Sequence, residues 1–208
     1  MGEVKSYSQF GEDLFISKIF PVGYKGVCID VGATDGIGMS NTYKFELDGW
    51  LSICIEANPE MSKALVQNRK YGYWYAVSNE NRDDVEFTIV NLGGGNETAV
   101  SALELDQRLL RDHENMGPQI RKVKVSMRTL DSILDEIGFQ GFVDFVSIDT
   151  EGTELDVLKG FDILRFSPRL FVIENNYNDP MIEAYLNGFG YVKIIRNVVN
   201  DFYIKVNE

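Results

Sequence analysis

Residues 26–38 read Gly-Val-Cys-Ile-Asp-Val-Gly-Ala-Thr-Asp-Gly-Ile-Gly. The first six of these residues form a short, nearly continuous apolar run, which is typical of a strand that is buried on both faces of a sheet. Gly32 and Gly36 follow the run, and glycine lets the backbone turn sharply and lets a ligand approach the main-chain N–H groups. The stretch therefore predicts a buried strand that ends in a tight, glycine-rich turn.

Asp30 distinguishes this turn from the dinucleotide-binding pattern, which needs three glycines before a helix. Here the carboxylate precedes the glycines and lies inside the expected strand. A carboxylate in that place can recognise an ammonium group directly or through water, and S-adenosylmethionine (SAM) carries such a group at its amino-acid end. Taken alone, the stretch leaves two interpretations open, a SAM-binding loop and a simple tight turn.

Segments typical of strands and of helices alternate along the rest of the chain. Further strands are expected at residues 50–56, 73–78, 85–91, 122–127, 142–149 and 169–175, and helices at residues 40–47, 59–68 and 129–137, from residue 153, and at 180–187. Residues 191–196 and 201–206 are expected to pair as a terminal hairpin. This order predicts an α/β fold with a mostly parallel sheet and one antiparallel edge. Because no repeat or linker divides the sequence, residues 1–208 are expected to form a single domain.

Acidic or amide side chains stand at or beside the ends of four expected strands. These residues are Asp30, Glu56, Asp149, and Glu174 with Asn175. In an open α/β sheet, ligands bind outside the carboxyl ends of the strands. One such residue is readily explained as a helix cap or a surface acid, but the whole set predicts a binding site along one edge of the sheet.

Glu56 ends the second strand, about 20 residues past the glycine-rich turn, at the place where an acid binds the hydroxyl groups of a ribose. A nicotinamide-dependent oxidoreductase uses the same contact and is the competing enzyme class. The sequence lacks the three-glycine fingerprint and a Tyr-x-x-x-Lys pair. A SAM-binding enzyme is therefore favoured over the oxidoreductase.

Composition limits the partners and the compartment. The formal net charge is −12, which argues against nucleic acid and against anionic membrane surfaces. No apolar run is long enough to span a bilayer, and no signal peptide is recognised. Cys28 and Cys54 lie in apolar runs and are expected to be reduced thiols, so a cytoplasmic protein is expected.

Residues 146–160 read Val-Ser-Ile-Asp-Thr-Glu-Gly-Thr-Glu-Leu-Asp-Val-Leu-Lys-Gly. This block closely resembles the I-D-x-E-G-x-E-x-x-x-L-x-G pattern of the FkbM-type family of SAM-dependent methyltransferases. The I-D-V-G-A first loop, the E-x-x-P pattern at Glu56 and the S-Q-x-G-E-D opening at residues 8–13 are also similar to that family. The resemblance runs from Ser8 to about Tyr203, and the block at Asp149 is its most specific part.

The resemblance implies a Rossmann-like class I methyltransferase fold with a mostly parallel seven-stranded sheet, a C-terminal antiparallel hairpin, and an N-terminal helical segment (residues 1–25) near the cofactor site. It implies that Asp30 and the loop hold the methionyl part of SAM, that Glu56 holds the ribose, and that Asp149 lies beside the sulfonium. The full set of implied cofactor-binding residues is Asp30, Gly32, Ala33, Thr34, Gly36, Glu56, Ala57, Val77, Ser78 and Asp149. The family usually has Asn where this chain has Thr34, and because Thr34 keeps a hydrogen-bonding side chain, SAM binding is expected to be retained.

A hydroxyl acceptor needs a general base, which contributes about 10²–10⁴-fold to the rate. The candidates are Asp149, Glu151, Glu174 and the single histidine, His113. Asp149 and Glu174 are favoured because their strands are expected to end side by side. His113 lies in a charged stretch that is typical of an exposed surface.

Asp149, Glu174 and Asn175 together offer hard oxygen ligands that suit Mg²⁺. The alternative is that Asn175 and Asn176 merely cap the following helix. A metal-dependent and a metal-free reaction therefore both stay open at this point.

The resemblance implies O-methylation of a hydroxyl group on a sugar, a glycan or another small molecule. Two alternatives remain, namely the nicotinamide-dependent oxidoreductase and a SAM-binding module that has lost its chemistry. The acceptor is expected to be selected by residues 93–118 and 175–179, and self-association into a homo-oligomer is a further option.

Overall fold

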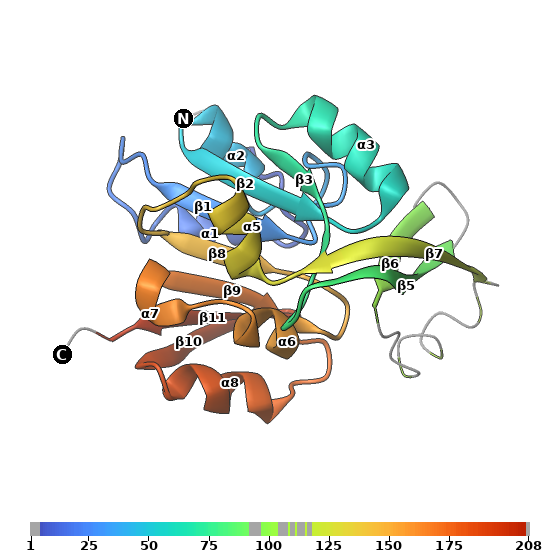
Figure 1. Ribbon diagram of the computed structural model, residues 1–208. Coiled ribbons are helices and arrows are strands. Elements are labelled where there is room, and N and C mark those ends of the chain that lie inside the picture. Colours follow the sequence, from blue (N-terminus) through green and yellow to red (C-terminus); the bar gives the residue numbers. More distant parts are fainter. Residues whose placement is uncertain are drawn as a thin grey trace.

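The computed structural model describes residues 5–91, 97–103, 108, 111, 115 and 118–206 of the chain. A sheet of seven strands forms its centre, in the spatial order β10-β11-β9-β8-β1-β2-β3 (Figure 1). The strands are β1 (Val27–Val31), β2 (Leu51–Glu56), β3 (Gly72–Trp74), β8 (Phe145–Ile148), β9 (Leu170–Glu174), β10 (Tyr191–Asn197) and β11 (Asn200–Lys205). Strands β3, β2, β1, β8 and β9 run parallel to one another, as predicted.

The C-terminal hairpin forms as predicted and makes the antiparallel end of the sheet. Strand β11 is inserted between β9 and β10 and is antiparallel to both, so the sheet is mixed. Burial explains the order, because Phe202 and Tyr203 of β11 are both 0% exposed whereas Val192 and Ile194 of β10 are each 44% exposed. The strand with apolar residues on both faces takes the inner place.

A second sheet was not predicted. It has the order β4-β7-β5-β6 and extends from the side of the large sheet, at the right of Figure 1. Its strands are β4 (Ala76–Val77), β5 (Arg82–Asn91), β6 (Glu97–Ala102) and β7 (Gln119–Arg128). The segment expected as one strand at residues 73–78 is therefore divided, since β3 pairs with β2 and β4 pairs with β7. The strands expected at residues 85–91 and 122–127 are present within β5 and β7, but β6 was not expected, and the assignment of all strands to a single sheet was wrong.

Helices cover both faces of the large sheet. They are α1 (Glu12–Ile16), α2 (Tyr43–Leu47), α3 (Pro59–Asn68), α5 (Leu130–Glu136), α6 (Glu154–Lys159), α7 (Ile163–Phe166) and α8 (Pro180–Asn187). The side chain of Asn58 accepts a hydrogen bond from the Glu60 N–H at 3.0 Å, so Asn58 caps α3 and Pro59 begins it, as predicted.

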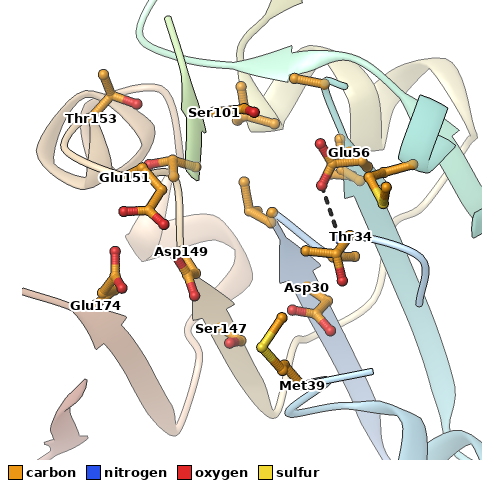
Figure 2. A pocket seen from close by; sticks show the side chains of 18 of the residues that line it. Asp30, Thr34, Met39, Glu56, Ser101, Ser147, Asp149, Glu151, Thr153 and Glu174 are labelled. Carbon is orange, nitrogen blue, oxygen red and sulfur yellow. Dashed lines mark hydrogen bonds between the residues drawn. The ribbon is translucent and has the colours of Figure 1, made fainter. Parts of the chain in front are cut away.

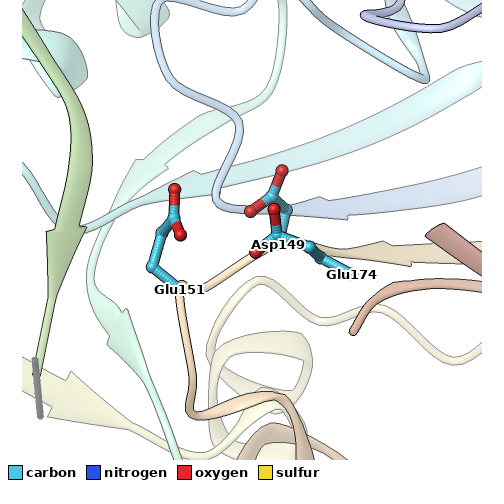
Figure 3. A group of neighbouring side chains, drawn as sticks. All are labelled: Asp149, Glu151 and Glu174. Atoms are coloured by element: carbon cyan, nitrogen blue, oxygen red, sulfur yellow. The ribbon is translucent and has the colours of Figure 1, made fainter. Parts of the chain in front are cut away.

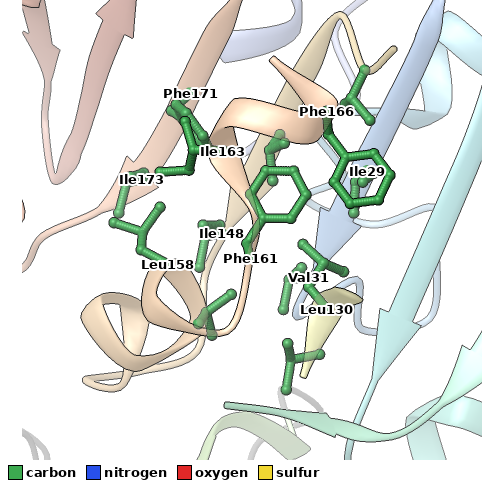
Figure 4. Close-up of a cluster of buried hydrophobic side chains, with 14 of the residues drawn as sticks. Ile29, Val31, Leu130, Ile148, Leu158, Phe161, Ile163, Phe166, Phe171 and Ile173 are labelled. Carbon is green, nitrogen blue, oxygen red and sulfur yellow. The ribbon is translucent and has the colours of Figure 1, made fainter. Parts of the chain in front are cut away.

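Alternation along each strand creates two different interiors. Ile29 and Val31 of β1 and Ile148 of β8 point toward α5–α8 and join the largest apolar cluster, which Figure 4 shows with Phe161 and Phe166. On the other face, Cys28, Phe145 and Val172 pack against α1 and α2. Side chains on one face of a strand recur every second residue. The acids at strand ends therefore belong to the face that carries Cys28 and Asp30.

Both cysteines are buried and free. Cys28 pairs in register with Ser52, and Cys54 pairs with Asp30, so the two thiols lie diagonally on neighbouring strands. Among the described residues, no helix combines the length and the hydrophobicity that crossing a lipid bilayer requires.

Gly32 directly follows β1 at a point where the backbone after β8 comes very close. Its φ is +84°, and a Cβ atom there would lie 1.7 Å from the carbonyl oxygen of Asp149. Backbone atoms cannot yield as a flexible side chain can, so the approach of β1 to the segment after β8 requires glycine at this position.

We predict that Gly32→Ala destabilises the protein by more than the left-handed conformation alone would. Gly190 is the matched control, because its φ is +81° and nothing lies within 4 Å of its missing side chain. Gly190→Ala should cost about 1–2 kcal/mol of unfolding free energy from strain alone, and Gly32→Ala should cost clearly more in urea denaturation. Equal losses in the two variants would contradict the proposed steric clash.

Candidate functional site

The carboxyl ends of β1, β2, β8 and β9 open onto one cavity of about 500 Å³ (Figure 2). Its walls come from the glycine-rich loop, the residues that follow β8, the N-terminal segment and the second sheet. The predicted site residues on the wall are Asp30, Gly32, Ala33, Thr34, Glu56, Ala57, Val77, Asp149 and Glu174. Parallel strands thus bring together residues that are far apart in the sequence.

Asp30 is 5% exposed and presents its carboxylate to this cavity. One of its oxygens accepts hydrogen bonds from the Thr42 hydroxyl at 2.6 Å and from the Ser40 hydroxyl at 3.2 Å. Burial raises the pKa of Asp30 on balance, and the Thr42 bond, the charge of Arg69 and the Ser40 bond oppose part of that shift. These donors favour the ionised form, which an ammonium ligand requires.

Glu56 accepts hydrogen bonds from the backbone of two different segments. One carboxylate oxygen accepts from the Thr34 N–H at 2.8 Å, and the other accepts from the Asn58 N–H at 2.7 Å (Figure 2). Burial raises the pKa of Glu56, and these backbone donors oppose the shift. Each carboxylate oxygen has a second lone pair, so Glu56 retains the capacity to accept from a pair of ligand hydroxyl groups.

Thr34 occupies the loop in a left-handed conformation, with a φ of +49°. A β-branched residue is rare at positive φ, whereas Asn adopts this conformation more readily. Its N–H donates to Glu56, as described above, and its hydroxyl lies 3.4 Å from the carbonyl oxygen of Gly38. The loop is therefore held in a conformation that this residue does not prefer.

Three carboxylates gather beyond the end of β8 (Figure 3). One oxygen from each of Asp149, Glu151 and Glu174 lies within 4.8 Å of the other two. Burial is the main cause that raises the pKa of each of them, and the negative charges of the neighbouring acids raise the pKa values of Glu151 and Glu174 further. Oε2 of Glu151 is enclosed and has no hydrogen-bond partner among the described residues. The cluster can share protons or hold a cation, but no described basic side chain within it balances its negative charge.

Glu154 lies close to this cluster but has a different task. Its Oε1 accepts from the Thr150 N–H at 3.0 Å, the Thr150 hydroxyl at 3.1 Å and the Gly152 N–H at 3.0 Å. Glu151, between them, has a φ of +60°. Glu154 therefore fixes the turn that presents Glu151 to the cavity.

The amide group of Asn175, which was predicted as a metal ligand, makes hydrogen bonds with other parts of the protein. Its amide nitrogen donates to the carbonyl oxygen of Asp179 and to the carboxylate of Asp201, each at 3.1 Å, and its amide oxygen accepts from the Asp179 N–H at 2.6 Å. The alternative, in which this residue orders the start of the next helix, agrees with these contacts. Glu151 supplies the third oxygen instead.

Three further residues predicted for the site are not found on the described cavity wall. Gly36 faces Arg69 and Leu65 rather than the cavity, and Ser78 packs against Gly160. Both were placed on the cofactor surface from the motif alone, and neither lines it. His113 lies outside the described residues.

The S-Q-x-G-E-D opening proves to be an anchored segment beside the cavity. Asp13 accepts hydrogen bonds from the Ser6 hydroxyl at 2.6 Å, the Tyr7 N–H at 2.8 Å and the Ser8 hydroxyl at 2.9 Å. Glu12 is 0% exposed and accepts from the side chains of Asn197 and Asn200. These bonds tie the chain's opening to the β10–β11 turn.

The anchored segment brings Gln9 and Phe10 to the cavity wall, where the sequence had predicted no contact residue. Phe87, Ser101 and Leu103 of the second sheet and its connection also line it. Nothing in the sequence pattern of these strands distinguished them from ordinary surface strands. Their contribution depends on the second sheet, which was itself not predicted.

The described wall of the cavity is strongly acidic. It contains five carboxylates, from Asp30, Glu56, Asp149, Glu151 and Glu174, and no lysine, arginine or histidine among its described residues. Enclosed surfaces of one sign concentrate ligands of the opposite sign. The cavity therefore favours a ligand that carries positive charge.

Comparison with known proteins agrees with this geometry. The methyltransferase FkbM domain family matches residues 30–193, which is most of the chain. The crystal structure of methyltransferase FkbM from Methylobacillus flagellatus KT is similar, with a TM-score of 0.56 and 14% identity over 95% of this chain and 48% of that protein. This chain spans about half the length of that protein, and the similarity shows a shared α/β methyltransferase-like fold. No curated protein matches the chain.

We predict that Glu151→Gln raises the thermal midpoint at pH 8. Because burial raises the pKa of Glu151 above its ordinary 4.5, the folded state holds this proton more tightly than the unfolded state does. Stability from this group therefore falls as pH rises above 4.5, and an uncharged amide avoids the loss. The gain should disappear near pH 4, where the carboxyl is protonated in both states.

Glu80→Gln is the control for this comparison, since the Glu80 side chain is 56% exposed. It should leave the thermal midpoint nearly unchanged at both pH values. A lower midpoint for Glu151→Gln at pH 8 would show that Glu151 stabilises the fold. It would refute the inference that the buried Glu151 carboxyl destabilises the folded state at this pH.

Proposed function

The chain belongs to the FkbM methyltransferase family, and we propose that it transfers a methyl group from SAM to a hydroxyl group of a sugar, a glycan or another small molecule. The observation that carries the proposal is the set of acids that end four parallel strands at one cavity, without a described basic residue on its wall. SAM brings the positive charge that such a cavity favours. The same charge argument disfavours phosphorylated or carboxylated acceptors.

The proposed cofactor position follows the family motif along the cavity. Asp30 is assigned to the ammonium group, and the backbone of Gly32, Ala33 and Thr34 to the rest of the methionyl part. Glu56 is assigned to the two ribose hydroxyls. Val77 lines the same cavity with Tyr75 and Phe87, and these apolar surfaces suit the flat adenine ring.

SAM supplies an activated methyl group on a positively charged sulfur. The protein's own task is to align an acceptor oxygen with that carbon, and good alignment can supply about 7–11 kcal/mol of the barrier. The acceptor oxygen forms its new bond to the methyl carbon as the bond to sulfur breaks. Asp149 is assigned the task of accepting the hydroxyl proton, and Glu174 can share that proton because the two carboxyls are hydrogen-bonded.

A divalent cation is the second way in which the cluster can serve this reaction. Carboxylate oxygens are the ligands that Mg²⁺ prefers, and Asp149, Glu151 and Glu174 offer three of them. The enclosed Oε2 of Glu151, which has no described partner, fits a ligand role. A cation there would lower the pKa of the acceptor hydroxyl and reduce the need for a base.

Measurements of ligand binding and of turnover distinguish the methyltransferase from the oxidoreductase and from a silent SAM-binding module. Family membership favours a methyltransferase over the nicotinamide-dependent oxidoreductase. Calorimetric titration with SAM and with NAD should show binding of SAM alone. A silent SAM-binding module would bind SAM without methylating any member of a panel of sugars and glycans in a tritiated-methyl assay.

We predict that Glu56→Ala weakens binding of S-adenosylhomocysteine (SAH) about tenfold or more, because charged hydrogen bonds are each worth about 1.5–3 kcal/mol. Adenosine and 2′,3′-dideoxyadenosine provide the matched comparison. The wild type should prefer adenosine, and the variant should lose that preference. Unchanged SAH affinity in a folded variant, measured by calorimetry, would remove Glu56 from the ribose site.

We predict that Asp149→Asn abolishes methyl transfer and leaves most of the SAH affinity intact. Asn keeps the size of Asp149 but cannot accept the acceptor's proton, and loss of rate with retained binding marks a group that acts in the transition state. In the wild type, the rate should rise with pH through about 7, because burial raises the pKa of Asp149 to about 7 and only its ionised form is a base.

Chelation distinguishes the two uses of the cluster. If a cation is required, EDTA should abolish wild-type transfer and added Mg²⁺ should restore it. If the carboxylate acts as a base alone, EDTA should have no effect. Near wild-type turnover by Asp149→Asn would exclude both roles, and loss of SAH binding would assign Asp149 to the cofactor site instead.

A further inference from the structure

Arg69 follows α3 directly and is buried, with 4% of its surface exposed. Its Nη1 donates to the carbonyl oxygen of Gly36 at 2.8 Å, and its Nε donates to the Glu46 carboxylate at 2.8 Å. Arg69, Gly36 and Glu46 are not among the residues that line the cavity. The guanidinium therefore supports this loop from behind.

The same guanidinium reaches Asp30 through two hydroxyl groups. Nη2 donates to Oγ1 of Thr42 at 3.0 Å, and Nη1 donates to Oγ of Ser40 at 3.3 Å. Both hydroxyls in turn donate to the same oxygen of Asp30, as described above. A hydroxyl has one proton, so an oxygen that accepts from arginine directs its own proton to another acceptor. Arg69 thus orients two donors toward Asp30, and such chains strengthen one another.

Gly36 gains a physical explanation from this arrangement. A Cβ atom at Gly36 would lie 2.5 Å from Cγ of Arg69 and 2.7 Å from a methyl carbon of Leu65. The second glycine of the motif therefore makes room for the arginine side chain. It does not line the cavity, which is where the sequence motif had placed it.

We propose that Arg69 is a positioning residue for the amino-acid end of the cofactor. Through Thr42 and Ser40 it keeps Asp30 ionised and aimed into the cavity, and through Gly36 it fixes the loop that follows Asp30. This inference rests on the proposed SAM site. It assigns to Arg69 a selective effect on ligands that carry the amino-acid group, beyond a general effect on folding.

The test compares two ligands that differ only at that end. SAH carries the ammonium and carboxylate groups, and 5′-methylthioadenosine lacks them. Calorimetry should give a dissociation constant for SAH that is raised about tenfold or more in Arg69→Lys and in Thr42→Val, since each loses charge-assisted contacts to the Asp30 network. The dissociation constant for 5′-methylthioadenosine should stay within about twofold of the wild type.

Ser52→Ala is the matched control. Ser52 is a buried hydroxyl on β2 that contacts Cys28 and is outside the Arg69 network. Its removal should leave both dissociation constants unchanged. The thermal midpoints of all three variants show whether each variant folds. If Arg69→Lys does not fold, Thr42→Val alone provides the comparison of the two ligands.

Three outcomes overturn the inference. Equal weakening of both ligands would show a merely structural role, and unchanged SAH affinity in folded variants would show no role. In both of these cases the wild type still binds SAH, and the proposed function stands. If the wild type binds neither ligand, the proposed function falls and the positioning role falls with it.

Discussion

Compensation of buried negative charge is the constraint on which the site depends. A carboxylate that leaves water needs donors or a counter-charge, or it takes up a proton. Asp30 is compensated by two hydroxyls and Arg69, Glu56 by two backbone N–H groups, and Glu154 by backbone donors of its own turn. Asp149 and Glu174 are hydrogen-bonded to each other, and Oε2 of Glu151 has no hydrogen-bond partner among the described residues. The compensated acids hold structure and can present a fixed charge, whereas the uncompensated ones can exchange a proton or a cation.

Parallel topology explains why these acids meet. Strands β1, β2, β8 and β9 run in the same direction, so their carboxyl ends open at one edge, and the side-chain period of two places Asp30 and Glu56 on a common face. The opposite face is occupied by the main apolar cluster. The second sheet and the anchored N-terminal segment then enclose what would otherwise be an open crevice. Enclosure is what removes water from the acids and makes their ionisation costly.

Much of this arrangement could be predicted from the sequence. Apolar runs located the strands of the large sheet, and their terminal acids located the cavity. What failed depended on partners that a local pattern does not specify. Residues 73–78 look like one strand, but the chain changes sheets within them. The hairpin pattern likewise does not say which of its two strands pairs with β9. Asn175 was predicted as a metal ligand because the sequence does not show that its side chain bonds to Asp179 and Asp201.

The backbone of the loops around the cavity could not be predicted from local sequence. Thr34, Met39 and Glu151 line the cavity and have left-handed backbones, with φ values of +49°, +57° and +60°. Residues other than glycine disfavour this conformation by about 1–2 kcal/mol each. Local sequence preference therefore opposes the observed loops, and tertiary bonds must impose them. Glu56 holds Thr34, and Glu154 holds the turn at Glu151. A site whose geometry is set by distant partners in this way is rigid where it meets the ligand, and only the assembled fold reveals it.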